Sequence, residues 1–176
     1  MEKKYILTDD VIDFNGHTLH RIKAVRDFDC VKAGDLGGFI ESEKNLDHDG
    51  DAWVFDNARV SGDAWVSGDA WVFDNAKVSG DACVSGNAGV SGDAWVSGDA
   101  WVHAPFDIAL IKGFGSKFRA TSFFRCVDGL VRCQCGCFYG TVDEFRSKVR
   151  ETHGNSKYAK EYLMIADLME LHFKED

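Results

Sequence analysis

Only one proline occurs among the 176 residues, and no apolar run approaches the roughly 18 residues that a membrane-spanning helix requires. The sequence opens with MEKKYILTDD, which lacks the apolar stretch of a secretory signal peptide. Hydrophobic residues make up 45% of the chain, so these absences favour an ordered, soluble protein with no membrane partner. They also place its six cysteines in the reducing cytoplasm as free thiols.

The motifs of several common enzyme classes are missing as well. The chain has no P-loop, no dinucleotide-binding fingerprint, no serine nucleophile elbow and no HExxH zinc motif. The whole chain has a formal net charge of −9. Basic residues are scarce in its middle, where residues 51–104 carry eight acids and two bases. Binding to a phosphate backbone needs clustered Lys and Arg, so we expect no direct contact with nucleic acid.

What the chain does contain is a six-residue repeat. Val recurs at every sixth position from Val54 to Val102, and an Ala stands two residues before each, from Ala52 to Ala100. Residues two apart on a strand point to the same side, so each Ala and Val pair points inward and the residue between them points outward. Gly-Asp or Asp-Asn pairs then form the bends between strands.

The repeat also has a longer period. Residues 53–70 and 71–88 are identical at fifteen of eighteen positions, which indicates that three six-residue units close one turn of a triangular prism. A single unit cannot bury its own apolar side, whereas stacked coils can. The sequence therefore predicts a mainly β fold, a left-handed parallel β-helix of hexapeptide repeats, with three coils over residues 51–104.

Residues 1–50 are expected to form a β cap on the first coil. Asn15-Gly16 joins two alternating segments, which is a good β-hairpin signal. Residues 33–46 look like a degenerate coil, because Ile40 and Leu46 lie six apart before a two-residue slip to Ala52. Such departures from the consensus are typical of a terminal repeat, which must close the array.

Residues 105–176 lose the six-residue period and are expected to form a small ββαα module. A hairpin is predicted about Asp128-Gly129, and a capping box at Thr141 begins a helix that ends at Gly154. A second amphipathic helix begins at Ser156. Its apolar positions are Tyr158, Tyr162, Ile165, Leu168, Met169 and Phe173. The module either caps the last coil or folds back along the prism.

Several stretches of the chain resemble known proteins. The pattern V-S-G-D-A-W is similar to the consensus of the hexapeptide-repeat proteins. The opening KKYILTDD with NGHTLHRIKAVRDF, the segment KAGDLGGFIESEKNL and the tail RCQCGCFYGTVDEF resemble uncharacterised proteins of bacteria and of bacteriophages or prophages. The opening is also similar to putative transferases with a β-helix. The resemblance implies a phage-encoded protein that acts on host machinery, and it implies no particular activity.

Large aromatic side chains occupy outward positions of the array. One prism face is expected to carry Trp53, Phe55, Trp71 and Phe73, and the other two faces to carry Trp95 and the pair Trp65 and Trp101. This exceeds the apolar patch of a few hundred Å² that a monomer usually exposes. We therefore expect self-association, as a trimer or dimer along the prism faces. The alternatives are that the C-terminal helices cover the aromatic face, or that it binds a ligand or a foreign protein.

His103 is the candidate catalytic residue of an alternative interpretation. The array resembles hexapeptide acyltransferases, which typically use a His near a subunit boundary, and His103 is the only His in the coils. As a neutral imidazole it would serve as general base in an acyl-CoA-dependent transfer. No excursion loop interrupts residues 51–104 to build a pocket for an acyl carrier, however, and the expectation leans away from an enzyme.

Four cysteines are close in sequence near the second hairpin: Cys126, Cys133, Cys135 and Cys137. The last three alternate and are expected to share one side of a strand, so a zinc site with His153 is conceivable. The C-x-C-x-C spacing differs from the usual C-x₂-C knuckle, and small buried cysteines in the hairpin core are the favoured interpretation. We expect neither metal nor cofactor.

The bends should stack acidic side chains along the prism edges. Asp63, Asp81 and Asp99 fall on one edge, and Asp51 and Asp69 begin another. Neighbouring coils lie about 4.8 Å apart, so these charges repel one another unless they are solvated, hydrogen-bonded or bridged by cations such as Ca²⁺. Solvated turn residues are the favoured interpretation. The sharper alternative is a carboxylate ladder that imitates a phosphate backbone and blocks a basic site on a host nuclease or defence protein.

These observations together favour a non-enzymatic binding or scaffold protein. The expected partners are further copies of the same chain and a host protein with a basic surface, which a phage-encoded protein would inhibit in the host cytoplasm. The alternative function is a hexapeptide-type acyl- or acetyltransferase.

Overall fold

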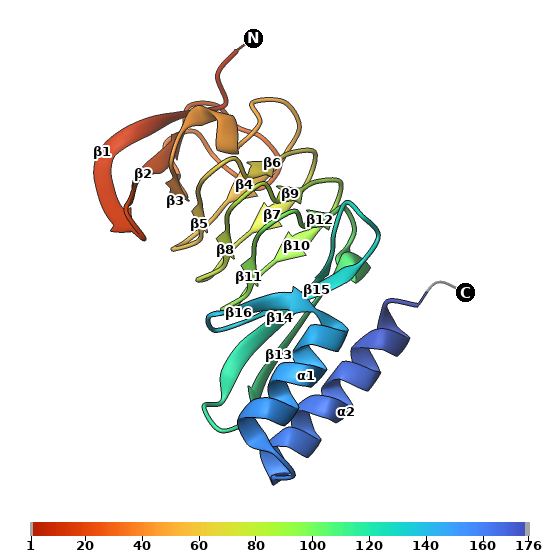
Figure 1. The fold of residues 1–176 in the computed structure, drawn as a ribbon. Helices are drawn as coiled ribbons and strands as arrows, with labels where there is room; N and C mark the ends of the chain where they lie inside the picture. The colour runs from red at the N-terminus through yellow and green to blue at the C-terminus, as the bar shows by residue number, and fades with distance from the viewer. Residues whose placement is uncertain (1, 175–176) are drawn as a thin grey trace.

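The computed structural model describes residues 2–174. A parallel β-solenoid of about four turns forms the middle of the molecule, with an N-terminal β cap at one end and a sheet with two helices at the other (Figure 1). The predicted fold class, a mainly β chain built on a parallel β-helix with a C-terminal module of strands and two helices, is confirmed. Neither helix of the described part is long and apolar enough to cross a membrane.

The solenoid consists of nine two-residue strands that pair in parallel with the strand eighteen residues away, as Val60 pairs with Val78. They form three faces with strand orders β4-β7-β10, β6-β9-β12 and β5-β8-β11. The strands are β4 (Trp53–Val54), β5 (Arg59–Val60), β6 (Trp65–Val66), β7 (Trp71–Val72), β8 (Lys77–Val78), β9 (Cys83–Val84), β10 (Gly89–Val90), β11 (Trp95–Val96) and β12 (Trp101–Val102).

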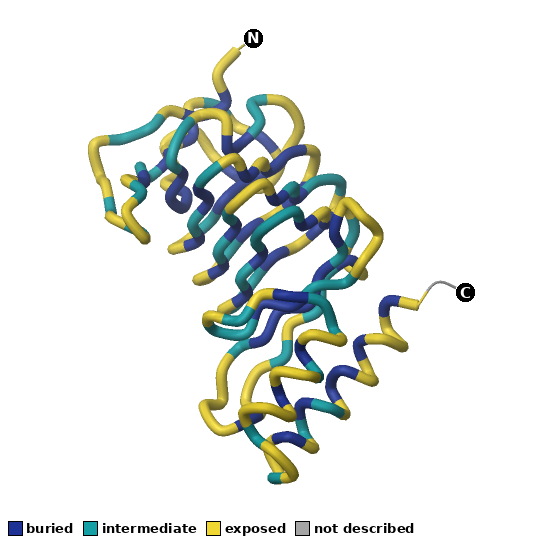
Figure 2. The backbone as a smooth tube through the Cα atoms, viewed as in Figure 1, coloured by how far each residue is buried: buried dark blue, intermediate teal, exposed yellow. Residues whose placement is uncertain are grey.

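The interior of the solenoid is filled by the repeated Ala and Val side chains. Each Val from Val54 to Val102 and each Ala from Ala52 to Ala100 is at most 1% exposed. Burial of apolar surface, at roughly 25 cal/mol per Å², is therefore the main stabilising contribution of this part of the chain. Figure 2 shows the result as regular bands of buried backbone across the coils. The four remaining positions of each six-residue repeat face outward.

Two aspartates close one edge of the prism by bonding from coil to coil. Asp56 and Asp74 lie in the bends with positive φ values of 51° and 60°. The carboxylate of Asp56 accepts a hydrogen bond from the Asp74 amide at 3.3 Å, and that of Asp74 accepts one from the Gly92 amide at 2.9 Å. Asp tolerates this left-handed conformation because its short side chain can bond locally. These side chains thus support the stacking of successive coils.

The N-terminal cap begins with the hairpin β1 (Tyr5–Phe14) and β2 (His17–Ala24), which turns at Asn15-Gly16. Strand β3 (Leu36–Ile40) then pairs antiparallel with β2 and parallel with β5, and the short 3₁₀ helix η1 (Glu43–Asn45) follows. Ile40 pairs with Val60, and Leu46 bridges to Val66. Both registers span the eighteen residues of a coil plus the two-residue slip expected from the sequence.

A buried lysine completes the cap. Within the solenoid, amides donate to carbonyls of the following coil, as the Trp53 amide donates to the Ala70 carbonyl at 3.0 Å. Carbonyls of the first coil therefore need donors from outside the array. The Lys4 ammonium, which is fully buried, donates to the Ala52 carbonyl at 2.9 Å and to the Gly50 carbonyl at 3.3 Å. Burial lowers the pKa of Lys4 to about 8.

The C-terminal module follows η2 (Pro105–Asp107) and has a four-stranded antiparallel sheet. The hairpin about Asp128-Gly129 and the capping box at Thr141 lie where the sequence places them. Strands β13 and β16 are additional to the predicted hairpin; the latter has only four residues. The elements are β13 (Ile108–Phe114), β14 (Arg119–Arg125), β15 (Val131–Cys135), β16 (Phe138–Thr141), α1 (Val142–His153) and α2 (Lys157–His172).

This module caps the last coil and does not fold back along the prism. One side of its sheet adds Phe124 and Cys126 to the solenoid core, while the other side contributes Phe123 and Cys133 to a second core with the helices. The Trp95 amide donates to the Ser122 hydroxyl at 2.9 Å. Figure 1 shows α1 and α2 on the side of the sheet away from the solenoid. The helices therefore leave the solenoid faces uncovered.

The buried Lys4 ammonium predicts an unusual pH dependence of stability. Its folded-state pKa of about 8 lies below the ordinary lysine pKa of 10.5, so the unfolded chain binds the proton more tightly. The free energy of unfolding should therefore rise by about 2 kcal/mol between about pH 7.5 and about pH 9.5. Urea titrations at both pH values measure it. In Lys4→Met this rise should vanish; an equal rise in the variant would contradict the assignment to Lys4.

Candidate functional site

The most exposed large side chains of the solenoid lie on the face formed by β6, β9 and β12. Trp65 is 45% exposed and Trp101 is 51% exposed. Each alternates with an inward Val on its two-residue strand, so the packing of the interior fixes the indole outside. We call the outward side chains of Trp65, Cys83 and Trp101 the tryptophan face. Neither the cap nor the C-terminal helices cover its two indoles.

The middle of the tryptophan face is lower than its two ends. Cys83 pairs with Trp65 on one side and with Trp101 on the other, and it is half-buried. At a coil spacing of about 4.8 Å, the two indole positions lie roughly 10 Å apart. Because a thiol is much smaller than an indole, we expect a notch between the two indoles at Cys83. A single extended side chain of a partner fits between the indoles.

One edge of this face carries the expected acidic column, but its charges are not equivalent. Asp63 pairs with Lys44 at 2.6 Å, which holds the pKa of that carboxyl below its usual value. Asp99 accepts a hydrogen bond from the Tyr139 hydroxyl at 2.8 Å and lies 3.4 Å from Arg132. Asp81, on the same coil as Cys83, has no ion pair within the described residues. The negative charge is therefore concentrated beside the notch.

The second acidic edge contributes less to any one surface. Asp51 and Asp69 are both exposed, and Asp51 lies at the N-terminal end of the array near the Lys4 ammonium. A continuous ladder of unpaired carboxylates along the prism is therefore absent from residues 2–174. The nearby cations reduce the similarity of the acidic edges to a phosphate backbone.

His103 lies at the end of the tryptophan face. Its imidazole is 3.0 Å from the Ser85 hydroxyl, and its ring is 6.2 Å from that of Trp101 at an interplanar angle of 29°. The residue is exposed, as the sequence predicts for an outward position. Ser85 is the one hydrogen-bond partner of its ring within the described residues, so the ring lacks the carboxylate that orients the histidine of a catalytic triad.

The prediction that Trp53 forms part of a contact surface is wrong. Its side chain is 1% exposed, because the N-terminal cap packs Phe28 at 5.3 Å and Tyr5 at 6.1 Å from its ring. On the same face, Phe55 is half-buried and lies 5.4 Å from Trp71. Phe73 is also half-buried, which leaves Trp71, 38% exposed, as the most accessible aromatic there.

Trp95 occupies the third face, next to the C-terminal sheet. Its indole nitrogen donates to the Ser79 hydroxyl at 3.1 Å, and the Lys77 ammonium lies 5.4 Å from its ring. The side chain is half-buried. The seven candidate aromatics lie on three faces of the solenoid, and Trp65 and Trp101 are the pair that is well exposed on one face.

The four candidate cysteines do not converge. Cys126 belongs to the solenoid core, and burial raises the pKa of its thiol to about 11. Cys133 belongs to the module core on the other side of the sheet, where burial raises its pKa further. Cys135 is half-buried, and Cys137 lies exposed in the β15–β16 turn instead of continuing the strand. Within residues 2–174, no three His, Cys, Asp or Glu side chains form a group that could hold a metal ion.

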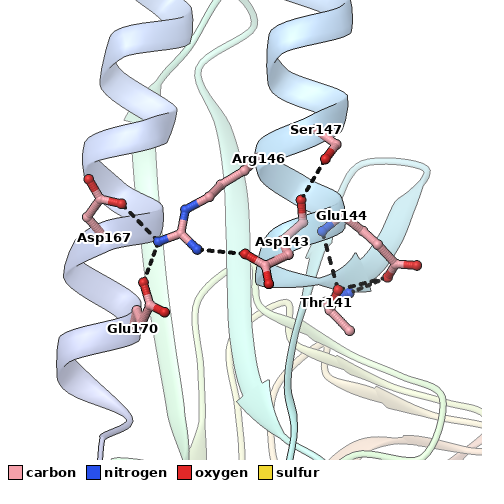
Figure 3. A network of polar contacts seen from close by, with 7 residues as sticks. All are labelled: Thr141, Asp143, Glu144, Arg146, Ser147, Asp167 and Glu170. Atoms are coloured by element: carbon pink, nitrogen blue, oxygen red, sulfur yellow. Dashed lines mark hydrogen bonds and ion pairs between the residues drawn. The ribbon is translucent and has the colours of Figure 1, made fainter.

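The sequence analysis missed a polar network that joins the two helices. Arg146 on α1 contacts Asp143 at 3.0 Å, Asp167 at 2.8 Å and Glu170 at 2.6 Å, so one guanidinium ties three carboxylates together (Figure 3). Its partners on α2 lie 21 and 24 residues away. A search for helix pairs three or four residues apart finds only the contact to Asp143.

Helix α2 also has a second apolar stripe that the sequence analysis assigned incompletely. Met164, Leu168 and Leu171 are each more than half exposed, although Leu168 was expected among the buried positions. Their spacing of four and three residues is itself helical and could have revealed the stripe. This surface is separate from the tryptophan face.

Comparison with known proteins agrees with the repeat architecture. The family model described as the YdcK beta solenoid repeat matches residues 52–68, which is about one turn of the solenoid. A comparison with curated proteins gives no match. The family match supports the solenoid, and it assigns no ligand, partner or reaction.

The Arg146 network predicts a measurable contribution to the helix pair. Replacing Arg146 with Ala removes contacts to three exposed carboxylates and should lower the free energy of unfolding of the C-terminal module by about 1 kcal/mol. Thermal unfolding followed by circular dichroism measures this. The control Lys160→Ala, an exposed position on α2 outside the network, should change stability less; equal losses would show that the network contributes nothing specific.

Proposed function

We propose that the protein is a non-enzymatic binding or scaffold protein whose tryptophan face docks a basic, partly apolar segment of a protein partner. The observation that carries the proposal is that two exposed indoles, Trp65 and Trp101, stand on either side of the smaller Cys83. The Asp81 carboxylate on the same coil adds an uncompensated negative charge. This combination suits a long cationic side chain, such as that of Arg, on the partner.

The energetics of such contacts favour recognition through these few residues. A cation over an indole face contributes about 0.5–1 kcal/mol at an exposed site and about 2 kcal/mol when desolvated. Tryptophan is also enriched among the residues that dominate binding energy at protein interfaces. The flat, rigid solenoid holds both indoles in place before binding, which lowers the entropy cost of association.

The resemblance to bacteriophage and prophage proteins supports a more specific form of this proposal. In that form the partner is a host protein with a basic surface, and docking of the acidic solenoid blocks it. Nucleic-acid-binding surfaces are basic, so a nuclease or other defence protein has the required charge. The pairing of Asp63 and Asp99 with cations favours recognition near Asp81 and the two indoles over recognition along a whole carboxylate ladder.

Self-association as a dimer or trimer remains part of the proposal. The tryptophan face and the α2 stripe are two exposed apolar surfaces that such an assembly would use. Light scattering on Trp65→Ser with Trp101→Ser, compared with Met164→Gln and Leu168→Gln, separates them. A lower mass in the first variant assigns the contact between copies to the tryptophan face, and a lower mass in the second assigns it to α2.

Acyl transfer with His103 as base is the alternative function, and no particular contact favours it. The imidazole bonds to Ser85 on an open face, and no carboxylate among residues 2–174 orients its ring. Saturable binding of acyl-CoA to the wild type, lost in His103→Ala, would establish it in place of the binding role.

Titration with a short peptide of alternating Arg and Leu tests the docking face, with tryptophan fluorescence as the signal. Replacing both Trp65 and Trp101 with Ala should weaken binding about tenfold or more, because two cation–π contacts are lost. The matched control is Trp71→Ala, which removes an exposed indole from another face and should leave affinity unchanged.

Charge variants refine the same titration. Asp81→Asn should weaken the peptide and reduce the salt dependence of binding, whereas Asp63→Asn should have little effect because Lys44 already neutralises that carboxylate. Equal effects of the two variants, or equal affinity for a peptide of alternating Glu and Leu, would remove the proposal.

A further inference from the structure

A cavity of about 320 Å³ opens in the C-terminal module between helix α1 and the loops at one end of the sheet. Aromatic rings form much of its wall: the Phe138 and Phe145 centroids lie 5.8 Å apart, and those of Phe145 and Tyr162 lie 5.5 Å apart. We call this the α1 cavity. Its volume is near the lower end of the range for small-molecule sites, roughly 300–1,000 Å³.

The charge of the α1 cavity is opposite to that of the protein. Lys117, Arg119 and Lys148 line it and no carboxylate does, although the chain carries a net charge of −9. Lys148 pairs with Glu151 at 2.9 Å. Lys117 and Arg119 have no carboxylate within 4 Å in the described part of the chain. Unpaired cations around an apolar concavity raise the local concentration of anions.

A favourable interaction with the C-terminal end of helix α1 explains only some of the cationic side chains that line the cavity. Lys148 and His153 lie in the C-terminal half of α1, where cations interact favourably with the helix dipole. Lys117 belongs to the β13–β14 connection and Arg119 begins β14, so neither stabilises a helix end. The Arg119 guanidinium lies against Gly136 in the β15–β16 turn, and Arg119 lines the cavity.

Tyr162 adds a neutral hydrogen-bonding group to the wall. Burial, together with the nearby Cys135 thiol, raises the pKa of Tyr162 to about 12, so its hydroxyl stays protonated at neutral pH. The hydroxyl lies 3.4 Å from the Phe114 carbonyl. The His153 ring lies 5.8 Å from that of Tyr162 and extends the aromatic wall.

We propose that the α1 cavity binds a small planar aromatic compound that carries a phosphate, of the nucleoside monophosphate class. The base stacks against the half-buried Phe138 ring, and the phosphate accepts charge-assisted hydrogen bonds from Arg119 and Lys117. A cavity of about 320 Å³ has room for one nucleotide and not for a longer strand. The ligand is therefore a free mononucleotide and not a nucleic-acid strand.

Calorimetric titration of the full chain with AMP at low ionic strength tests the proposal, and adenosine and inorganic phosphate are the fragment controls. AMP should bind at least tenfold more tightly than either fragment. Arg119→Gln should lower the AMP affinity about tenfold, the value of one charge-assisted hydrogen bond. Lys112→Gln, at a lysine that pairs with Asp93 outside the cavity, should leave it unchanged. The double variant of Trp65 and Trp101 should also retain binding, which separates this site from the tryptophan face.

The cysteines supply a second measurement on the wild-type protein. Cys137 lines the cavity and is exposed, whereas Cys30 is exposed in the distant N-terminal cap. Bound AMP should slow alkylation of Cys137 and leave that of Cys30 unchanged. Equal affinities for AMP and adenosine, or equal alkylation of Cys137 with and without AMP, would overturn the proposal. Tighter binding of pentaadenylate than of AMP would overturn the assignment to a free nucleotide.

Discussion

The stacking of Ala and Val side chains inside an eighteen-residue turn is the constraint on which the rest of the structure depends. Each inward pair is fully buried, and each is positioned by backbone hydrogen bonds to the coils above and below. Successive side chains on a strand point to opposite sides, so the residue before each inward Val must point outward. The accessible indoles of Trp65 and Trp101 are thus a direct result of how the interior packs.

A second constraint arises at the ends of the array. Each coil donates its amides to the following coil, so the first coil is left with carbonyls that need donors and the last with amides that need acceptors. Apolar side chains of the last coil also need a cover. Lys4 supplies donors at the first end, and Phe124 and Cys126 cover the apolar side chains at the other. The two terminal modules are therefore parts of one folding unit with the solenoid, and one of them also carries the cationic α1 cavity on its far side.

The sequence predicts the solenoid well because its information is local and repeated. The Ala and Val period, the hairpin at Asn15-Gly16 and the capping box at Thr141 each depend on residues a few positions apart. The burial of Trp53 depends on Tyr5 and Phe28, which lie 48 and 25 positions earlier in the sequence. The six-residue repeat contains no information about these contacts. Strands β13 and β16 likewise gain their order from pairing with β14 and β15. The candidate site was found only in part, because which outward aromatics stay exposed is decided by the caps.

The near-identity of residues 53–70 and 71–88 has a consequence for how this chain changes over generations. Equivalent residues of the two copies lie next to each other on neighbouring coils. Unequal recombination between the two matching gene segments would therefore add or delete one whole coil and leave both ends of the solenoid unchanged. The length of the solenoid would then change by one coil at a time, and each change would alter the distance between its two ends. The number of eighteen-residue repeats therefore sets the distance between the two terminal modules.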